Sequence, residues 1–244
     1  MASLLEVVDI SVQFGGLLAV DGAEFTVEAG GITGLIGPNG AGKTTLFNVI
    51  TGLQPPSRGV VRFDGREINR KRPYKRARLG IARTFQRLEA FGSLSARENV
   101  MVALEMRRRW SRVDDADALA DSLLEDVGIA GVAHRKVESL PTGTARLVEL
   151  ARALATEPKL LLLDEPSSGL DEAESDALSA LLRRLAAGGL GVLLVEHDMP
   201  LVMETCSVIN VLDFGRVIAS GAPEEIQRDP AVQRAYLGTT KAGA

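Results

Sequence analysis

Apolar and polar residues alternate over residues 4–28, around a pair of glycines at Gly15 and Gly16. This alternation, with its enrichment in β-branched residues, predicts two strands of a half-exposed sheet joined by a turn. Residues 32–36 instead form a short, mainly apolar strand, and a glycine-rich loop connects them to a helical pattern over residues 43–51. The N-terminal part is therefore expected to combine an antiparallel sheet with a strand-loop-helix unit.

The middle of the chain carries almost no β signal. After a predicted strand at residues 80–85, the pattern of residues 88–154 is helical. Ser95 and Glu98 have the spacing of a capping box at a helix start. Three helices are expected in this stretch: the first begins at Ser95, the second covers residues 115–127 and the third covers residues 144–155. We interpret this stretch as a helical insertion.

A β/α alternation returns towards the C-terminus. Residues 160–163 and 191–195 are continuously apolar, as in strands of a parallel sheet that is covered on both faces. The other predicted elements are an amphipathic helix over residues 172–187, two strands around Gly215 within residues 208–220, and two short helices split by Pro230 within residues 223–236. The fold class is α/β, with a mainly parallel sheet, an antiparallel β subdomain and an inserted helical subdomain.

Composition narrows the class of protein. With 244 residues, 45% of them hydrophobic and 25% charged, the chain matches a folded globular protein. Lys and Arg number 28 against 32 Asp and Glu, a net charge of -4 that argues against nucleic acid held by bulk charge. A single cysteine, Cys206, excludes an internal disulfide. We expect no secretory leader and no membrane-spanning helix, because the sequence shows no basic leader and no apolar run of sufficient length.

The glycine-rich loop carries the first candidate chemistry. It fits the phosphate-loop pattern G-x-x-x-x-G-K-[ST] between a predicted strand and a predicted helix. Its glycines allow backbone N–H groups to converge on phosphate oxygens, and the helix adds its positive dipole end. We expect Lys43 to neutralise the β- and γ-phosphates and Thr44 to ligate Mg²⁺. The nucleotide-binding residues expected here are Gly37, Pro38, Asn39, Gly40, Ala41, Gly42, Lys43, Thr44 and Thr45.

Polar residues follow two of the buried strands. Asp164 and Glu165 end the first, where an acid often caps the next turn. Beside a phosphate loop the pair suits two roles: Asp164 holds the water shell of the metal, and Glu165 takes a proton from the attacking water. His197 follows the second strand, where ligands bind in doubly wound sheets, although it could equally cap the next helix.

Together these residues resemble those of the ATPase subunits of ABC transporters, over nearly the whole chain. The resemblance implies a P-loop NTPase core that hydrolyses ATP with Mg²⁺. It also implies that Gln86 forms a Q-loop that ligates Mg²⁺ and senses the γ-phosphate, and that Phe14 stacks on adenine, with ordinary sheet packing as the alternative for Phe14. The implied catalytic residues are Glu165, His197 and Lys43. The implied units are the ATP-binding core in two parts, residues 1–87 and 156–244, and a helical subdomain, residues 88–155.

The signature loop of the family, usually Leu-Ser-Gly-Gly-Gln before a helix, departs from its pattern here. In the family this loop caps the γ-phosphate of ATP held by the opposite subunit. Pro141 has neither a hydroxyl nor an N–H, whereas Gly143 is retained and Thr142 carries a hydroxyl. A weakened or asymmetric composite site is therefore expected, to which Asp171 of the D-loop also contributes in trans. The signature positions are Leu140, Pro141, Thr142, Gly143 and Thr144.

Within the family the sequence is most similar to the branched-chain amino acid uptake group. The motifs that carry this resemblance are residues 14–20, 83–86, 196–203 and 234–238. The resemblance implies a peripheral subunit at the cytoplasmic face of the membrane that pairs with a second ATPase subunit, as a homodimer or a heterodimer. It further implies transmembrane permease subunits and an extracytoplasmic solute-binding protein. A lipopolysaccharide-type lipid transport ATPase and a regulatory ABC ATPase without transport stay open as alternatives.

Two basic segments have more than one interpretation. Residues 66–78 are rich in Arg and Lys, which suits either anionic lipid headgroups or a solvated face. Arg107, Arg108 and Arg109 precede Trp110 in the helical insertion. They suit either a contact with the membrane partner or an exposed helix end.

Overall fold

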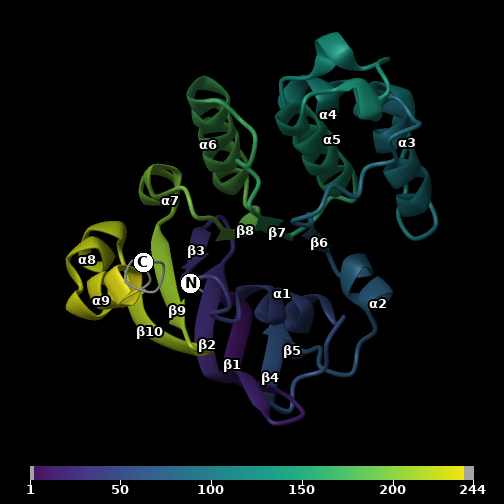
Figure 1. The fold of residues 1–244 in the computed structure, drawn as a ribbon. Helices are drawn as coiled ribbons and strands as arrows, with labels where there is room; N and C mark the ends of the chain where they lie inside the picture. The colour runs from purple at the N-terminus through teal and green to yellow at the C-terminus, as the bar shows by residue number, and fades with distance from the viewer. Residues whose placement is uncertain (1–2, 239–244) are drawn as a thin grey trace.

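The computed structural model describes residues 3–238, and its first strands build a four-stranded antiparallel sheet (Figure 1). The strand order is β2-β1-β4-β5. The turn at Gly15 and Gly16 joins β1 to β2, as the alternation predicted. The strands are β1 (Ser3–Phe14), β2 (Leu17–Glu28), β4 (Arg58–Phe63) and β5 (Arg66–Glu67). Residues 1–2 and 239–244, at the ends of the expected core units, lie outside the described residues.

A six-stranded sheet forms the centre, in the order β10-β9-β3-β8-β7-β6. All neighbouring pairs are parallel except that β10 is antiparallel to β9. The strands are β3 (Ile32–Ile36), β6 (Ile81–Arg83), β7 (Leu160–Asp164), β8 (Gly191–Val195), β9 (Val208–Asp213) and β10 (Arg216–Gly221). Since parallel strands end at the same edge, the loops that follow β3, β6, β7 and β8 lie along one edge of the sheet.

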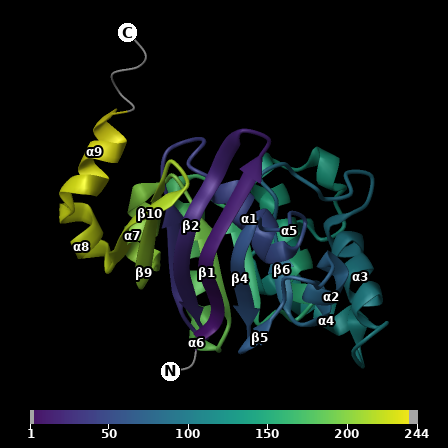
Figure 2. The same ribbon diagram turned by 90° about the horizontal axis from the view of Figure 1, so that it is seen from below.

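Helices cover this sheet and form a separate block at one end of the molecule. The block contains α3, α4 and α5, which pack on one another, and Figure 2 shows it at the opposite end from α8 and α9. Among residues 3–238, no helix is both long and apolar enough to span a membrane. The helices are α1 (Lys43–Thr51), α2 (Pro73–Arg78), α3 (Ala96–Arg107), α4 (Ala116–Asp126), α5 (Thr142–Ala155), α6 (Glu172–Ala187), α7 (Met199–Thr205), α8 (Pro223–Arg228) and α9 (Pro230–Gly238).

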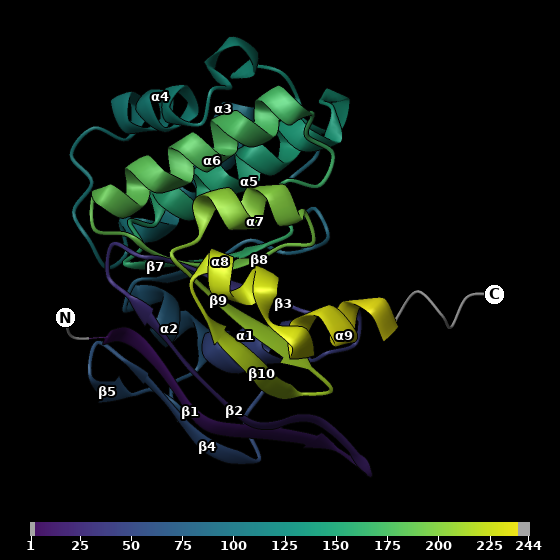
Figure 3. The same ribbon diagram turned by 90° about the vertical axis from the view of Figure 1, so that its left-hand side faces the viewer.

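The continuous apolar strands supply both cores of the protein. Leu161 and Leu163 of β7 pack with residues of α3 to α6, whereas Leu160 and Leu162 pack with residues of α1, β1, β2 and β4. Successive side chains of a strand point to opposite faces, so an unbroken apolar run is required where both faces are covered. Figure 3 shows the two layers, with α6 and α7 on one side of the central sheet and β1, β2 and β4 on the other.

Several element boundaries differ from the sequence-based expectation. Strand β6 ends at Arg83, so the strand predicted for residues 80–85 was too long. Helix α5 begins at Thr142 and not at residue 144, because Pro141 occupies the N-cap, where a missing N–H costs nothing. The unexpected β4 gains its backbone hydrogen bonds from β1, which a local pattern cannot reveal. Helices α2 and α7 are short and carry a proline in their first turn, and their helical periodicity is correspondingly weak.

Arg76 on α2 is 2% exposed, although it lies in the basic segment that the sequence placed at the surface. Its guanidinium donates to the carbonyls of Val49 and Ile50 at 2.6 and 2.8 Å, at the C-terminal end of α1. It also donates to the carbonyls of Asn69 and Lys71. Burial lowers the pKa of Arg76 to about 10, so the side chain is charged at neutral pH and complements the negative end of the α1 dipole. Arg76 therefore fastens α2 to α1.

Replacing Arg76 by Met is expected to lower the free energy of unfolding by about 3 kcal/mol, because buried carbonyls of α1 lose their donors. Urea denaturation followed by circular dichroism measures this change. The matched control is Lys75→Met, which removes an exposed cation from the same helix and is expected to change stability by less than about 0.5 kcal/mol. Equal losses in the two variants would contradict the fastening role of Arg76.

Candidate active site

The loop between β3 and α1 is clamped by neighbouring backbone. Gly37 and Gly42 have φ angles of 151° and 108°. A Cβ atom would lie 2.0 Å from the Leu212 carbonyl oxygen at Gly37, and 2.7 Å from the Ala19 carbonyl oxygen at Gly42. Both positions therefore require glycine. The close approach of β9 and β2 sets the conformation of the loop before any ligand enters.

Lys43 lies at the start of α1 with its ammonium held by the loop. Its Nζ donates to the carbonyls of Gly37 at 2.6 Å and Pro38 at 3.0 Å. Burial lowers the pKa of Lys43, and the negative charges of Glu165 and Asp164 oppose this shift. The acid pair predicted from the sequence thus acts on the predicted phosphate loop, and the two motifs belong to one site.

The acid pair ends β7 with two different surroundings. Asp164 is 3% exposed, and its Oδ2 forms an ion pair with an amino nitrogen of Arg83 at 3.0 Å. Glu165 has a φ of 52°, in the left-handed region that residues other than glycine seldom adopt. Its N–H donates to the Val195 carbonyl at 2.9 Å. The strained backbone at Glu165 therefore separates two adjacent carboxylates: Asp164 is buried and ion-paired, whereas Glu165 is partly exposed.

Glu165, Gln86 and His197 come together from three loops. The amide Nε2 of Gln86 donates to Glu165 Oε2 at 3.3 Å, and His197 Nδ1 lies 4.0 Å from Glu165 Oε1. Glu196, which the sequence analysis gave no role, accepts the N–H of His197 at 3.1 Å and the N–H of Ser167 at 2.8 Å. This buried carboxylate ties the loop after β8 to the loop after β7. His197 itself is 72% exposed, so it is free to approach a ligand.

Helix α5 holds the backbone of the Gln86 loop, which the sequence analysis also missed. Arg146 donates to the Gln86 carbonyl at 2.8 Å, and Arg152 donates to the Glu89 carbonyl at 2.8 Å. Between them, the buried Glu149 accepts the N–H of Glu89, and burial raises the pKa of Glu149. The available signal was the spacing of these charged residues along one face of a helix whose other residues are mainly apolar.

The signature positions lie at the start of α5, against the loop that precedes α6. A Cβ at Gly143 would lie 2.6 Å from Leu170 Cδ2 and 2.7 Å from the Gly169 carbonyl oxygen, so these two loops are in close contact. Thr142 is exposed, and the N-cap Pro141 makes no side-chain hydrogen bond. Asp171 caps α6 by accepting the Glu174 N–H at 2.8 Å. Leu140 and Thr144 flank the exposed turn and are half-buried.

Phe14 lies at the tip of the β1–β2 hairpin and is 48% exposed. The same hairpin reaches the phosphate loop at Ala19, whose carbonyl faces Gly42. An exposed aromatic ring on this hairpin is consistent with stacking on a base. Its assignment to adenine stays a prediction.

The oxygen donors at this edge fit Mg²⁺. Residues 3–238 contain no group of three or more His, Cys, Asp or Glu side chains able to hold a metal ion. Mg²⁺ bound to a nucleotide needs only one or two protein ligands, since phosphates and water supply the rest. Thr44 offers an exposed hydroxyl in the first turn of α1, and Asp164 offers Oδ1, which accepts no side-chain hydrogen bond among these residues. The side-chain amide of Gln86 contacts Glu165, so the place of Gln86 among the metal ligands stays a prediction.

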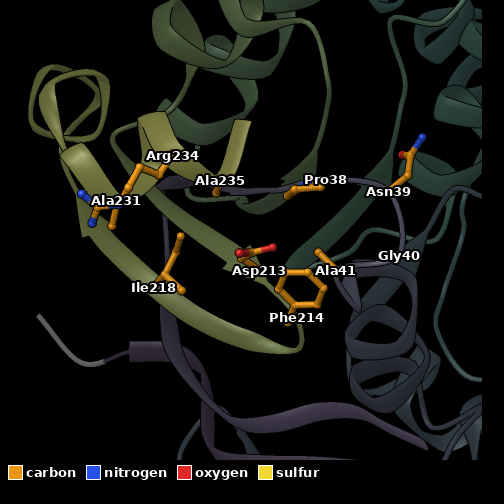
Figure 4. Close-up of a pocket in the computed structure, with 10 residues that line it drawn as sticks. All are labelled: Pro38, Asn39, Gly40, Ala41, Asp213, Phe214, Ile218, Ala231, Arg234 and Ala235. Carbon is orange, nitrogen blue, oxygen red and sulfur yellow. The ribbon is translucent and has the colours of Figure 1, made fainter. Parts of the chain in front are cut away.

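A pocket of about 520 Å³ lies beside the phosphate loop. Figure 4 shows the residues that line it. One wall is formed by Asn39 and Gly40 of the loop, and the other by Arg234 of α9. Phe214, in the turn between β9 and β10, borders the same pocket and is 89% exposed. The C-terminal helix therefore stands next to the phosphate loop.

Two family models match this chain, one over the phosphate loop and the acid pair and the other over the C-terminal segment. The model described as ABC transporter matches residues 20–168, from the second strand to the loop after the acid pair. The model described as branched-chain amino acid ATP-binding cassette transporter matches residues 216–242. This second match begins at β10 and includes α8 and α9, the segment that forms one wall of the pocket in Figure 4.

Curated relatives match over nearly their full length. The chain is 41% identical to the high-affinity branched-chain amino acid transport ATP-binding protein BraF of Pseudomonas aeruginosa, over 96% of this chain and 98% of the relative. It is 37% identical to LivG of Escherichia coli K12, which has the same description, with the same coverage. It is also 34% identical to the lipopolysaccharide export system ATP-binding protein LptB of Haemophilus influenzae, over 97% of this chain and 98% of that one.

Solved structures share the whole fold. A nucleotide-free ATP-binding cassette from an ABC transporter has a TM-score of 0.87 and 30% identity, covering 96% of this chain and 99% of the other. The ADP conformation of an ATP-binding cassette has a TM-score of 0.86 and 30% identity, covering 98% of this chain and 100% of the other. A dimeric post-hydrolysis cassette with ADP and Pi has a TM-score of 0.81 and 25% identity, covering 90% of this chain and 98% of the other. The predicted P-loop NTPase fold is confirmed.

Proposed function

The chain belongs to the ATP-binding subunits of ABC transporters, and from this premise we propose that it powers uptake of a branched-chain amino acid, or a similar small polar solute, through a separate permease. The observation that carries the solute class is the match of residues 216–242 to the branched-chain amino acid cassette model, together with the relatives BraF and LivG. The phosphate loop and the Glu165 cluster supply the machinery for ATP hydrolysis.

In the proposed reaction, water attacks the γ-phosphorus of ATP and the bond to the β–γ bridging oxygen breaks, which yields ADP and phosphate. Glu165 accepts the proton of the attacking water, and Gln86 holds its carboxylate in place at 3.3 Å. Lys43 and the exposed His197 stabilise the charge on the γ-phosphate. Thr44 and Asp164 would hold Mg²⁺, which when bound neutralises phosphate charge.

In the proposed dimer, each nucleotide also contacts the opposite subunit through loops that are exposed in a single subunit. Thr142 and Asp171 are exposed at the starts of α5 and α6, and the close contact of Gly143 with Leu170 keeps these two helix starts together. We assign both loops to contacts with the nucleotide of the opposite subunit. A similar cassette that is dimeric with ADP and Pi supports the dimer of this proposal. Whether the partner is a second copy or a related ATPase is decided by the purification below.

A groove of about 630 Å³ separates α2 and β6 from α3 and α5, and we name it the α2–α3 groove. Its lining includes the partly exposed apolar side chains of Tyr74, Phe85, Phe91, Val102 and Met106. We propose that it receives a cytoplasmic segment of the permease, which places the subunit at the cytoplasmic face of the membrane. The Gln86 loop begins at the wall of this groove. In this proposal the helical subdomain, residues 88–155, connects the permease to the two parts of the ATP-binding core, residues 1–87 and 156–244.

The two basic segments meet beside this groove. Arg78 of α2 lies 5.6 Å from the ring centroid of Tyr74 and 5.5 Å from that of Trp110. Arg107 and Arg108 form ion pairs with Glu157 and Glu105. Part of the basic charge is therefore balanced within the chain, and the aromatic contacts join the segments into one surface at the proposed permease side.

A lipid-transport ATPase is the second candidate, because LptB is 34% identical over 97% of this chain. BraF is more similar at 41%, and the match of residues 216–242 is to the amino-acid cassette model, so import of a small polar solute is favoured. An extracytoplasmic solute-binding protein is part of this proposal. A regulatory ABC ATPase would lack a membrane partner altogether.

Replacing Glu165 by Gln is expected to lower ATP turnover at least about 10³-fold, some 4 kcal/mol of barrier, because the amide cannot accept the proton of the attacking water. Phosphate release measures turnover, and a fluorescent ATP analogue is expected to bind the variant as it binds the parent. The control Asp176→Asn makes the same change at an exposed position of α6. Near-normal turnover in Glu165→Gln would remove Glu165 from the base role.

Replacing Pro141 by Ser is expected to tighten the ATP-dependent dimer about tenfold, since a new hydroxyl and N–H can bond a charged phosphate. The dimer dissociation constant is measured by analytical ultracentrifugation with ATP, in the Glu165→Gln background to prevent hydrolysis. Pro223→Ser, at the start of α8, is the matched control. An unchanged constant would show that Pro141 does not limit the composite site.

Purification of tagged Glu165→Gln protein from membranes, in mild detergent with ATP, tests the transport function itself. Two permease chains, with either a second copy or a related ATPase, are the expected companions. Loss of labelled leucine uptake on deletion of the gene, restored by the parent protein, tests the solute class. Recovery in the soluble fraction alone would overturn transport, and loss of lipid export without loss of uptake would favour the LptB-like candidate.

A further inference from the structure

Arg83 stands between the α2–α3 groove and the acid pair, and neither the proposed mechanism nor the sequence motifs give it a task. It ends β6, which lies beside β7, and its side chain is 5% exposed. One amino nitrogen donates to Asp164 Oδ2 at 3.0 Å, and the other donates to Asn48 Oδ1 at 2.6 Å. Arg83 thus binds a carboxylate of the central sheet and an amide of α1 at the same time.

Two aromatic rings enclose the same guanidinium. Its central carbon lies 5.1 Å from the ring centroid of Phe47 and 4.9 Å from that of Phe85. Phe47 and Asn48 belong to α1, the helix that begins at Lys43, whereas Phe85 directly precedes Gln86 and lines the groove together with Arg83. The phosphate-loop helix, the acid strand and the groove wall therefore all contact one side chain.

The chemistry of this contact set suits arginine alone. A guanidinium is a planar fork that bonds two oxygens while its faces stack on rings, whereas an ammonium is a point charge without faces. Burial opposes the charged form and lowers the pKa of Arg83, while the hydrogen bond and charge of Asp164 oppose that shift. The charge is kept inside the protein because Asp164 compensates it, so the two groups form a single unit.

We propose that Arg83 is a positioning residue for Asp164: it fixes Oδ2 so that Oδ1 is presented to the Mg²⁺ of the nucleotide, and it links that carboxylate to the groove wall at Phe85. The proposal rests on the function proposed above. Arg83 would then connect the α2–α3 groove to the metal-ligating Asp164 by a route that does not pass through Gln86. A partner that holds a metal-ligating carboxylate in place affects metal affinity about 10- to 100-fold.

The test compares the affinity of the purified subunit for a fluorescent ATP analogue in Mg²⁺ and in EDTA. The ratio of the two dissociation constants is the contribution of the metal. In Arg83→Gln we expect the affinity in EDTA to stay within about threefold of the parent, because the phosphate loop is intact, and the Mg²⁺ contribution to fall at least about tenfold. Arg83→Lys keeps the charge without the fork and is expected to recover part of this loss.

A double-mutant comparison separates positioning from general damage. If Arg83 acts through Asp164, then Arg83→Gln added to Asp164→Asn is expected to change the Mg²⁺ contribution by less than about twofold. Arg107→Gln, which removes an ion-paired and partly buried arginine of α3, is the matched control and should leave the ratio unchanged. Thermal unfolding of each variant shows that the fold is kept, and Arg83→Lys serves where Arg83→Gln does not fold.

Two results would overturn the proposal. One is an unchanged or larger Mg²⁺ contribution in Arg83→Gln or, where that variant does not fold, in Arg83→Lys, which would leave Arg83 a purely structural ion pair. The other is full additivity of the Arg83 and Asp164 substitutions. Failure of the proposed function would look different, since the parent protein would then still bind the nucleotide with its Mg²⁺ contribution, but no permease chains would copurify and leucine uptake would not depend on the gene.

Discussion

The candidate site depends on one constraint, which is that the parallel strands of the central sheet end at the same edge. Strand β3 leads to the phosphate loop, β6 to Gln86, β7 to Asp164 and Glu165, and β8 to His197. These strands are buried on both faces, so a shift of register would expose apolar side chains. Polar groups far apart in the sequence are therefore held together by an apolar scaffold that cannot easily move.

Charge within this edge is divided between its two acids. Asp164 is buried and compensated at short range by Arg83, because an unpaired carboxylate at that depth would be strongly unfavourable. Glu165 is more exposed and faces the amide of Gln86 and the imidazole of His197. Adjacent residues thus obtain separate environments from one strand end. Glu165 reaches Gln86 and His197 because its backbone is left-handed. A continued strand would instead point the Glu165 side chain to the opposite face of the sheet from Asp164.

Sequence reasoning reached most elements and the motif residues, because these depend on local patterns. Helix α6 and strand β8 occupy the predicted ranges, and the phosphate loop is recognised by fixed spacing. It did not reach interactions that depend on which distant segments meet. The ion pair of Arg83, the capping of α1 by Arg76 and the contact of Glu149 with the Gln86 loop join positions 26 to 81 residues apart. A basic or acidic residue in a polar segment gives no sign of such a partner.

Helix α5 shows why a departure in the signature loop is compatible with an otherwise intact site. The face that carries Glu149 holds the Gln86 loop, and Gly143 contacts the loop before α6, while the side chain of Pro141 makes no hydrogen bond. Proline therefore changes only the donors offered outside the subunit. In the proposed dimer those donors face the nucleotide of the partner, whereas the phosphate loop of this chain is completed by the partner's signature. Any weakness falls on the partner's site, so pairing with a different ATPase would leave one site fully equipped.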